Sequence, residues 1–569
     1  AVNIGLPKKS INGLPVYEMA SFGRNVFASN QSSTSQKVNL GKIFHMGAEQ
    51  EIDVDLDLKS LAMHTFITGS TGSGKSNTIY QLLRELTKQQ VHFLVIEPAK
   101  GEYKHVFGND MAKVYGTNDK LSPLLKLNPF RFPKQIHVLE HIDRLVEIFN
   151  VCWPMYAAMP AVLKDSVEKA YINAGWDLSE SYNKYSDELF PTFEDVLIEL
   201  NRVVTESAFS QEVKDNYIGS LATRIQSLTN GIYGKIFVND ELGDEVLFDD
   251  NVIVDLSRVG SVETKSMIMG ILVMRLQEYR MSSGAMNEDL KHVTVLEEAH
   301  NLLRRTSTEQ SSESANLLGK SVEMLSNAIA EVRTYGEGFI IADQSPGLLD
   351  MSVIRNTNTK IIMRLPDAED RNLVGRSANL NDEQIKELAK IPTGVAAVYQ
   401  NNWLEPVLCK IRYQGSDSIY SYQKDHRGNQ HDNKDKIVMH LLNKVAGERF
   451  DLNMDQICRE VLHAKLPTTQ KIKIFKLLKM NGNVELKDIS SVIYDIVASP
   501  GLEKEADKAE SIEDWKNTFL YADNSVVENL DEILKNQIAE CILREEIKRF
   551  DKPNEYLETW YKYLKGEVM

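Results

Sequence analysis

Cysteine is scarce in this chain. Its 569 residues include only Cys152, Cys409, Cys458 and Cys541, and none of them has a second cysteine at a metal-binding or disulfide-framework spacing. This pattern excludes a zinc-finger or disulfide-stapled module and favours reduced thiols. Long apolar runs are also missing: no stretch is long enough to span a bilayer, and the N-terminus "AVNIGLPKKS" lacks the apolar segment of a secretory signal. We therefore expect a cytoplasmic protein with no membrane anchor.

Positive charge is in deficit. Lysine and arginine number 65 against 81 aspartates and glutamates, so the net charge is −16. A surface of this sign repels nucleic acid as a whole, and any nucleic-acid site has to be a local basic surface such as a lined channel. The length predicts about two to four domains with room for a large apolar core.

The order of apolar patterns predicts an α/β fold. The buried strand "HTFITG", the amphipathic segment "NTIYQLLRELTKQQ" and the buried strand "VHFLVIEP" form a parallel strand–helix–strand unit. Further strands are expected at "NVIVDLS", "HVTVLEE", "GFIIADQ", "TKIIMRL", "GVAAVYQ" and "PVLCKIR". We expect a RecA-like P-loop NTPase core with a mostly parallel sheet, a helical insertion and a helical C-terminal region.

These patterns divide the chain into six segments. In chain order we expect an N-terminal short-strand segment, the first part of the ATPase core, a helical insertion, the second part of the core, a polar linker or loop, and a helical C-terminal domain. Their predicted bounds are 1–60, 61–133, 134–235, 236–412, 413–436 and 437–569.

One short stretch carries a phosphate-binding signature. The sequence "GSTGSGKSN" fits G-x-x-x-x-G-K-[ST] between a buried strand and an amphipathic helix, a context that distinguishes it from a plain Gly-rich turn. Its backbone N–H groups and the positive end of the following helix dipole suit phosphate oxygens. Lys75 is expected at the β- and γ-phosphates of ATP, and the Ser76 hydroxyl on Mg²⁺. The expected nucleotide-binding residues are Gly69, Ser70, Thr71, Gly72, Ser73, Gly74, Lys75, Ser76 and Asn77.

Two acidic residues follow another buried strand, in "VTVLEEAHNLL". Because ligands of open α/β sheets bind at the carboxyl ends of the strands, these acids should face the phosphates. Glu297 is expected to act on the Mg²⁺ shell and Glu298 to polarise the attacking water. The alternative is a pair of solvated acids that begin a helix. Residue 297 is Glu where many such ATPases carry Asp, so its contact with the metal could run through water.

A third strand ends in "IIADQSP" and places Gln344 at the same edge. We expect Gln344 to contact the γ-phosphate or to orient water, against the alternative of an ordinary polar residue at a strand end. Glu97, at the end of "FLVIEP", is a weaker candidate on the same logic.

Five stretches, taken in order, resemble one family. "HTFITGSTGSGKSNTIYQLL", "LVIEPAKGEY", "VLEEAHNLL", "EVRTYGEGFIIADQSP" and "NTKIIMRLPDAEDRNLV" together resemble the HerA-type ATPases of the HerA/FtsK group of P-loop translocases, over residues 40–412. The resemblance implies a ring, usually a homo-hexamer, with ATP sites between subunits and DNA in a central pore. It also implies an effector protein, either a nuclease or a sirtuin-like NAD-consuming protein, as in bacterial phage-defence operons.

Two features depart from the family pattern. The family usually has an N-terminal β-barrel, whereas a short segment precedes the phosphate loop here, so we expect a barrel that is absent, truncated or outside this chain. The acids "EE" in place of "DE", and "EPAKGEY" in place of an Asp-containing version, resemble the bacterial branch more than the archaeal one.

A ring ATPase needs an arginine that reaches the phosphates of a neighbouring subunit. Arg333, in "VRTYG", matches the family's Arg before a Tyr-Gly turn, and Arg355, Lys360 and Arg364 follow in "VIRNTNTKIIMR". We expect Arg333 and Arg355 to be catalytic, against the alternative that each is a surface cation. The sequence leaves open which arginine acts within its own subunit and which on the next one.

Three cations around a Ser-rich loop are candidates for DNA contact: Arg304, Arg305 and Lys320. A ring needs few basic residues per subunit, because symmetry multiplies them around the pore. The alternative is a solvated surface loop. No aromatic stacking platform accompanies these cations, which favours contact with the DNA backbone over the reading of bases.

Three functions compete. The first is an ATP-hydrolysing motor that translocates or unwinds DNA and acts with an effector in anti-phage defence or DNA processing. The second is a nucleotide-dependent scaffold that organises and activates an effector without processive translocation. The third, a conjugation-type DNA pump in a membrane, needs transmembrane helices that the sequence lacks.

Overall fold

The structure is a computed structural model. It describes residues 9–11, 14–16, 20–27, 36–305, 314–415, 419–423, 433–446, 454–464, 466–480, 483–498, 506, 508–509, 511–520, 526–527 and 530–566. The chain forms two compact units. The first comprises residues 1–125, 132–164 and 242–424, and the second comprises 126–131, 165–241 and 425–569. The division into six segments stays a prediction.

The first unit is built on one sheet of 11 strands. In chain order they are β3 (Lys37–His45), β4 (Ala48–Asp57), β5 (Thr65–Thr68), β6 (His92–Glu97), β7 (Lys113–Gly116), β10 (Val252–Asp255), β11 (His292–Glu297), β12 (Glu337–Asp343), β13 (Thr359–Ile362), β14 (Val395–Gln400) and β15 (Val407–Ile411). They pair in the spatial order β4-β3-β15-β14-β13-β5-β12-β11-β6-β10-β7. The strands from β13 to β7 run parallel, and the remaining four add an antiparallel extension.

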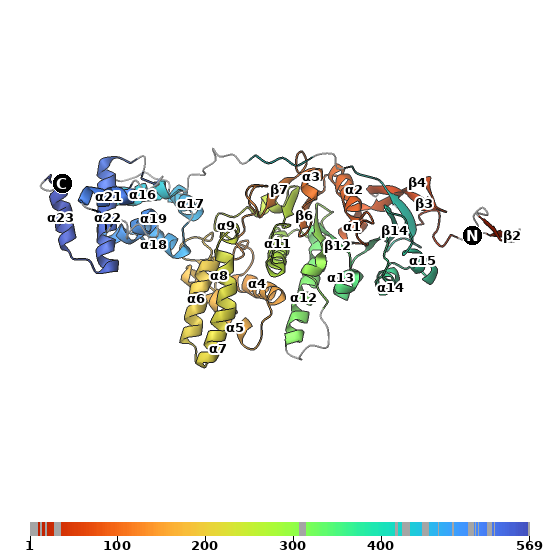
Figure 1. Ribbon diagram of the computed structural model, residues 1–569, viewed down its shortest axis with the longest axis horizontal. Helices are drawn as coiled ribbons and strands as arrows, with labels where there is room; N and C mark the ends of the chain where they lie inside the picture. Colours follow the sequence, from red (N-terminus) through yellow and green to blue (C-terminus); the bar gives the residue numbers. More distant parts are fainter. Residues whose placement is uncertain are drawn as a thin grey trace. The chain divides into compact units, whose positions relative to one another are not determined.

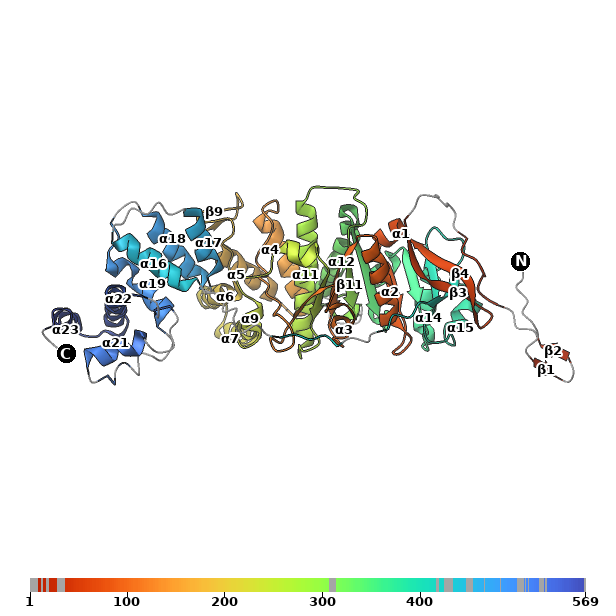
Figure 2. The same cartoon turned by 90° about the horizontal axis from the view of Figure 1, so that it is seen from above.

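The predicted mostly parallel sheet is therefore confirmed, and each buried strand predicted from an apolar run is present. Such runs form strands buried on both faces when helices cover both sides of a parallel sheet. β3 and β4, which come from the short-strand segment, continue this sheet and lie at the same end of the unit as α14 (Ala368–Ser377) and α15 (Asp382–Glu387) (Figures 1 and 2). A short hairpin, β1 (Lys9–Ile11) with β2 (Leu14–Val16), precedes them.

Helices cover both faces of the sheet (Figure 1). On one face lie α2 (Lys75–Lys88) and α3 (Tyr103–Phe107), and α2 buries Ile79, Leu82, Leu83 and Leu86 as its periodicity predicts. On the other lie α11 (Val262–Ser282), α12 (Ser314–Glu331) and α13 (Met351–Arg355), with α4 (Val138–Cys152) packed against α11 and α12. The short helices α1 (Leu58–Ala62) and α10 (Asp244–Phe248) complete this unit.

The second unit is mainly helical. It contains a two-stranded hairpin, β8 (Trp176–Asp177) with β9 (Tyr182–Asn183), and α5 (Met159–Asn173) leads into it. Its helices are α6 (Phe193–Glu206), α7 (Gln211–Tyr217), α8 (Thr223–Thr229), α9 (Tyr233–Ile236), α16 (Lys434–Val445), α17 (Met454–His463), α18 (Thr468–Lys479), α19 (Leu486–Val497), α21 (Ile512–Leu520), α22 (Glu532–Phe550) and α23 (Glu555–Leu564). The C-terminal helices bury a core of their own that includes Val438, Ile489, Ile542 and Trp560. The predicted helical C-terminal region is confirmed.

All four cysteines are unpaired, and Cys152, Cys409 and Cys541 are buried. Among the described residues, no helix combines the length and the apolar content that crossing a bilayer requires.

Candidate nucleotide site

The phosphate-binding signature forms a tight loop between β5 and α2. Gly72 and Gly74 have φ angles of +74° and +109°, which side chains strongly disfavour. A Cβ atom on Gly74 would lie 3.0 Å from the Met363 side chain and 3.3 Å from the Cα atom of Gly394. Glycine therefore allows the loop both its turn and its close contact with the chain before β14.

Two backbone hydrogen bonds hold this loop against neighbouring strands. The Ser70 N–H donates to the Arg364 carbonyl at 2.9 Å, just after β13, and the Gly394 N–H donates to the Ser73 carbonyl at 2.9 Å. The loop surrounds an open pocket of about 190 Å³, lined by Ser70, Gly72, Gly74, Lys75, Ser76, Asn77 and Lys100. The pocket lies at the carboxyl edge of the parallel strands, where the sequence predicts it.

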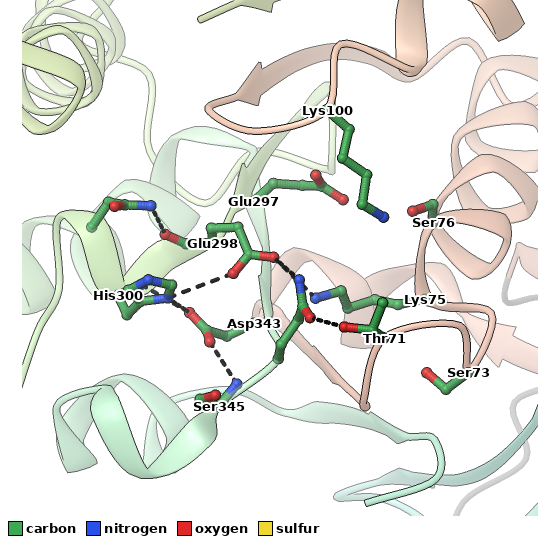
Figure 3. A network of polar contacts seen from close by, with 12 residues as sticks. Thr71, Ser73, Lys75, Ser76, Lys100, Glu297, Glu298, His300, Asp343 and Ser345 are labelled. Carbon is green, nitrogen blue, oxygen red and sulfur yellow. Dashed lines mark hydrogen bonds and ion pairs between the residues drawn. The ribbon is translucent and has the colours of Figure 1, made fainter. Parts of the chain in front are cut away.

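Four predicted residues meet at one side of this pocket (Figure 3). The Lys75 Nζ atom lies 3.5 Å from Glu298 Oε1, and only 8% and 13% of the two side chains are exposed. The Gln344 amide donates to the same Glu298 oxygen at 2.5 Å and accepts from the Thr71 hydroxyl at 2.6 Å. The structure thus brings Glu298 and Gln344 to the Lys75 end of the phosphate loop, where both are expected.

The backbone at Glu298 turns sharply out of β11. Its φ and ψ angles are 45° and 51°, a left-handed conformation that is uncommon outside glycine and clusters at functional sites. His300 lies behind the carboxylate: its Nδ1 atom is 3.6 Å from Glu298 Oε2 and 2.9 Å from Asp343 Oδ2. The hydrogen bond that the His300 ring donates to the Asp343 carboxylate raises the pKa of His300. This network orients Glu298 from the side opposite Lys75.

Glu297 is buried and lies on a different side of the pocket. It accepts a 2.7 Å hydrogen bond from the Tyr103 hydroxyl, and Figure 3 shows its carboxylate directed toward Ser76 and Lys100. Burial raises the pKa of Glu297. The Ser76 hydroxyl itself donates to the Glu102 carboxylate.

This donor set fits Mg²⁺, which prefers hydroxyl, carboxylate and water oxygens. Ser76 and Glu297 are the residues that would hold the ion, with Glu102 already beside the Ser76 hydroxyl. The assignment of Ser76 and Glu297 as metal ligands stays a prediction.

Glu97 supports the site through hydrogen bonds to the backbone of a neighbouring segment. Its carboxylate accepts the backbone N–H groups of Glu102 at 2.7 Å and Tyr103 at 3.3 Å, so it shapes the segment that carries those two residues. Burial raises the pKa of Glu97 to about 8.

Five residues of this site have no role that the sequence predicts. Lys100, Glu102 and Tyr103 lie in "EPAKGEY", and His300 and Asp343 lie next to residues that were assigned. The only sequence signal was their place just after predicted strands, and it does not reveal which side chains turn inward.

Two of the arginine candidates lie away from the pocket. Arg333 is exposed in the turn Val332–Tyr335 that precedes β12, and Arg355 is exposed at the end of α13, just before β13. The amino ends of these parallel strands form the edge opposite the phosphate loop. Lys360 is buried and donates to the Thr357 carbonyl at 2.5 Å, so it is tied within its own subunit. Arg364 follows β13 beside the loop.

The DNA-contact candidates are exposed. Arg304 and Arg305 are held by backbone pairing with the segment before α13, where the Arg305 N–H donates to the Leu348 carbonyl at 2.7 Å. Lys320 is exposed on α12. The Ser-rich loop at 306–313, which joins these positions, lies outside the described residues.

A phosphate loop at the carboxyl edge of a parallel sheet, with a lysine facing a glutamate that ends another strand, defines the class of P-loop ATPases. Within that class, residues 38–276 match the family model described as "Helicase HerA, central domain". The resemblance to HerA-type ATPases is confirmed, and the chain is an ATPase.

Curated relatives agree with this family. The "DNA double-strand break repair helicase HerA" of Sulfurisphaera tokodaii is 22% identical over 384 residues, which cover 66% of this chain and 70% of that protein. The protein of the same name from Sulfolobus acidocaldarius is 24% identical over 383 residues, with the same coverage of each chain. Among solved structures, VirB4 of Thermoanaerobacter pseudethanolicus aligns with a TM-score of 0.49 and 16% identity, over 67% of this chain and 97% of that one.

Proposed function

We propose that this protein is a cytoplasmic motor that hydrolyses ATP to translocate or unwind DNA through the central pore of a homo-hexamer. It works with an effector protein, a nuclease or an NAD-consuming protein, in bacterial anti-phage defence or DNA processing. The HerA family and the two relatives named as DNA repair helicases support the motor. The effector and the defence role rest on the sequence resemblance.

One observation supports a ring-shaped oligomer. The phosphate loop and Glu298 lie at the carboxyl edge of the parallel strands, whereas Arg333 and Arg355 lie before the amino ends of β12 and β13. An arginine at the far edge of the sheet does not reach its own subunit's phosphates. In a ring, the arginine can instead reach the phosphates bound to the neighbouring subunit. The two halves of one catalytic site then come from adjacent copies.

The residues divide the chemistry between them. Lys75 neutralises charge on the β- and γ-phosphates, and Ser76 and Glu297 hold Mg²⁺, which would stabilise the charge that develops on the phosphate oxygens. Glu298 accepts a proton from the attacking water, and Gln344, already bonded to Glu298, orients that water. The products are ADP and inorganic phosphate, and the arginine of the next subunit stabilises the transition state.

Turnover with and without DNA tests the proposal. We expect double- or single-stranded DNA to stimulate ATP hydrolysis, labelled strands to be displaced or moved, and the native mass to match six subunits in the presence of ATP. The scaffold function predicts the opposite pattern: ATP-dependent assembly with turnover that DNA leaves unchanged. Hydrolysis by a species proved to be a monomer would contradict the ring.

The DNA contact has its own test. Changing Arg304 and Arg305 together to Glu should weaken DNA binding and its salt dependence, because two cations per subunit are lost from the channel. The control changes the exposed Lys386 and Lys390 to Glu, which alters the net charge equally. Equal affinity of both double variants for DNA at low salt would remove Arg304 and Arg305 from the pore.

A further inference from the structure

A short segment beyond β15 is hydrogen-bonded to the first turn of α2, directly after the phosphate loop. The Asn77 side chain donates to the Arg412 carbonyl at 3.1 Å and accepts the Gln414 N–H at 2.7 Å. A carbonyl and an N–H two residues apart that point to the same side are the pattern of an extended strand. Residue 413 is therefore held in place beside Asn77, in the first turn of α2.

Tyr413 occupies that position, and its ring faces solvent. Side chains alternate along an extended segment, and the Gln414 side chain turns inward to donate to Gln81 on α2. The Tyr413 side chain thus projects from the opposite face, and 81% of it is exposed. A large aromatic ring on a backbone anchored this firmly keeps apolar surface in water, and that surface is available to a ligand.

The direction of a bound nucleotide follows from the catalytic residues. Lys75, Glu298 and Gln344 mark the end of the pocket where the γ-phosphate lies. The phosphate chain then runs along the loop toward Ser76 and Asn77, and the ribose and base emerge beyond Asn77. Every residue that lines the pocket is glycine, serine, asparagine or lysine, so the lining offers no apolar surface for a base.

We propose that Tyr413 is the platform on which the purine base of ATP stacks. The inference deepens the proposed function, since it rests on the ATP site, and it identifies a purine nucleoside triphosphate as the preferred substrate. The stacked ring would recover the apolar contact that the pocket lacks, and larger purine rings gain more from it than pyrimidines. Asn77 then contributes at both ends of the nucleotide. Its backbone contacts the phosphates, and its side chain holds the segment that carries the Tyr413 ring.

Binding of ADP and of pyrophosphate, both with Mg²⁺, separates the base from the phosphates. In calorimetry with the full chain, Tyr413→Ala should weaken ADP binding roughly tenfold or more and leave pyrophosphate binding unchanged. Tyr413→Phe should retain ADP affinity because it keeps the ring. Ile419→Ala is the matched control, because Ile419 is 83% exposed on the same stretch of chain. The preference of the wild type for ATP over CTP should shrink in Tyr413→Ala.

A spectroscopic variant gives an independent measurement. The fluorescence of Tyr413→Trp, compared with that of the wild type, should be quenched by ADP and unchanged by pyrophosphate. Equal weakening of ADP and pyrophosphate in Tyr413→Ala would mean that the ring only supports the loop. Unchanged ADP affinity with a lower native mass would make Tyr413 a subunit contact. Either result overturns the proposal.

The two proposals fail differently. Lys75→Ala should lose ADP and pyrophosphate together, and a wild-type chain that binds neither ligand would refute the ATP site and with it the base platform. The base platform alone is refuted if the wild type binds both ligands and Tyr413→Ala has the same ADP affinity and the same preference for ATP over CTP. Neither measurement depends on whether DNA is moved.

Discussion

At the scale of single residues, the contacts of the site converge on Glu298. Its left-handed backbone turns the carboxylate toward Lys75, and Gln344 and His300 bracket it from two directions. The strain of that backbone is balanced by these contacts, which also keep the side chain in one place. Glu297, one position earlier, keeps the regular conformation of β11 and points toward Ser76 instead. The two adjacent glutamates thereby point to different parts of the site.

We expect Glu298→Gln to bind ATP and to hydrolyse it at least about 100-fold more slowly, because an amide accepts no proton from water. Lys75→Ala should fail to bind ATP. Nucleotide binding measured beside phosphate release distinguishes the two variants, and Glu51→Gln, at a carboxylate that is 93% exposed, is the control. Near-normal turnover by Glu298→Gln would refute its role as the base.

His64 predicts a pH dependence of stability. Burial and, to a smaller extent, the Arg333 charge lower its pKa to about 4, although Glu337 opposes that shift, and the ring accepts the Phe339 N–H at 3.0 Å. The unfolded chain, with an ordinary histidine pKa of about 6.5, binds the proton first as the pH falls. The neutral ring therefore contributes stability above about pH 6.5 that is lost as the pH falls toward about 4.

The free energy of unfolding should fall by about 2 kcal/mol through this group between about pH 7.5 and about pH 5. His64→Asn removes the titration, keeps an acceptor for the Phe339 N–H and tolerates the left-handed backbone at this position, where φ is 65°. Urea unfolding of both proteins across this range measures the difference. Parallel pH profiles for the two would show that His64 does not titrate in this way.

At the scale of elements, a buried charge network ties α11 to the centre of the sheet. Glu337, at the start of β12, is fully buried and accepts from Arg280 of α11 at 3.0 Å. On the adjacent strand β11 it contacts the His292 ring at 2.9 Å and accepts from the Thr294 hydroxyl at 2.8 Å. Three groups from two elements thus share the Glu337 carboxylate of a third element, which fixes how α11 packs behind the strand that ends at Glu297.

Glu337→Ala should destabilise the first unit by about 3–5 kcal/mol, because Arg280, which keeps Asp249 as a partner, and the His292 ring both lose a buried carboxylate. Glu337→Gln should cost less, since it keeps an acceptor oxygen. Thermal unfolding of the two variants beside Glu51→Ala, an exposed control, tests this order. If all three variants melt together with the wild type, the network contributes nothing to the packing of α11.

At the scale of the whole molecule, the groups proposed as catalytic are divided between two edges of one sheet. β5, β11 and β12 present Lys75, Glu298 and Gln344 at their carboxyl ends, while Arg333 and Arg355 precede the amino ends of β12 and β13. The charge balance of −16 makes this division useful, since cations confined to an edge or a channel act locally while the rest of the surface repels nucleic acid.

Mixed rings test whether Arg333 acts on the next subunit. Arg333→Ala and Glu298→Gln should each be inactive alone. Co-expressed in equal amounts, they should recover hydrolysis at about a quarter of the interfaces, where an intact Glu298 faces an intact Arg333. Lys75→Ala mixed with Glu298→Gln is the control, because no interface then contains a complete site. Activity of the Arg333→Ala ring alone, or none in the mixture, would refute action across the interface.

Local features of the chain were predicted well. The strand at "HTFITG", the loop after it and the apolar face of α2 follow from neighbouring residues, and all are present. The strand ends that carry Glu298 and Gln344 were predicted from the rule for parallel sheets, and the two side chains do meet. Glu102 was not predicted, because its contact with Ser76 depends on how a turn folds back between two strands.

By itself, the sequence determined the phosphate loop, the α/β class and the resemblance to the HerA family, since each is encoded in contiguous residues whose spacing has a direct physical meaning. Only the tertiary structure decided that Arg333 lies on the far edge from Lys75 and that Tyr413, at the start of the predicted linker, lies beside Asn77. Those positions depend on the order and direction in which distant strands pair. That pairing is set by the burial of the whole sheet between its helices, and no local pattern records it.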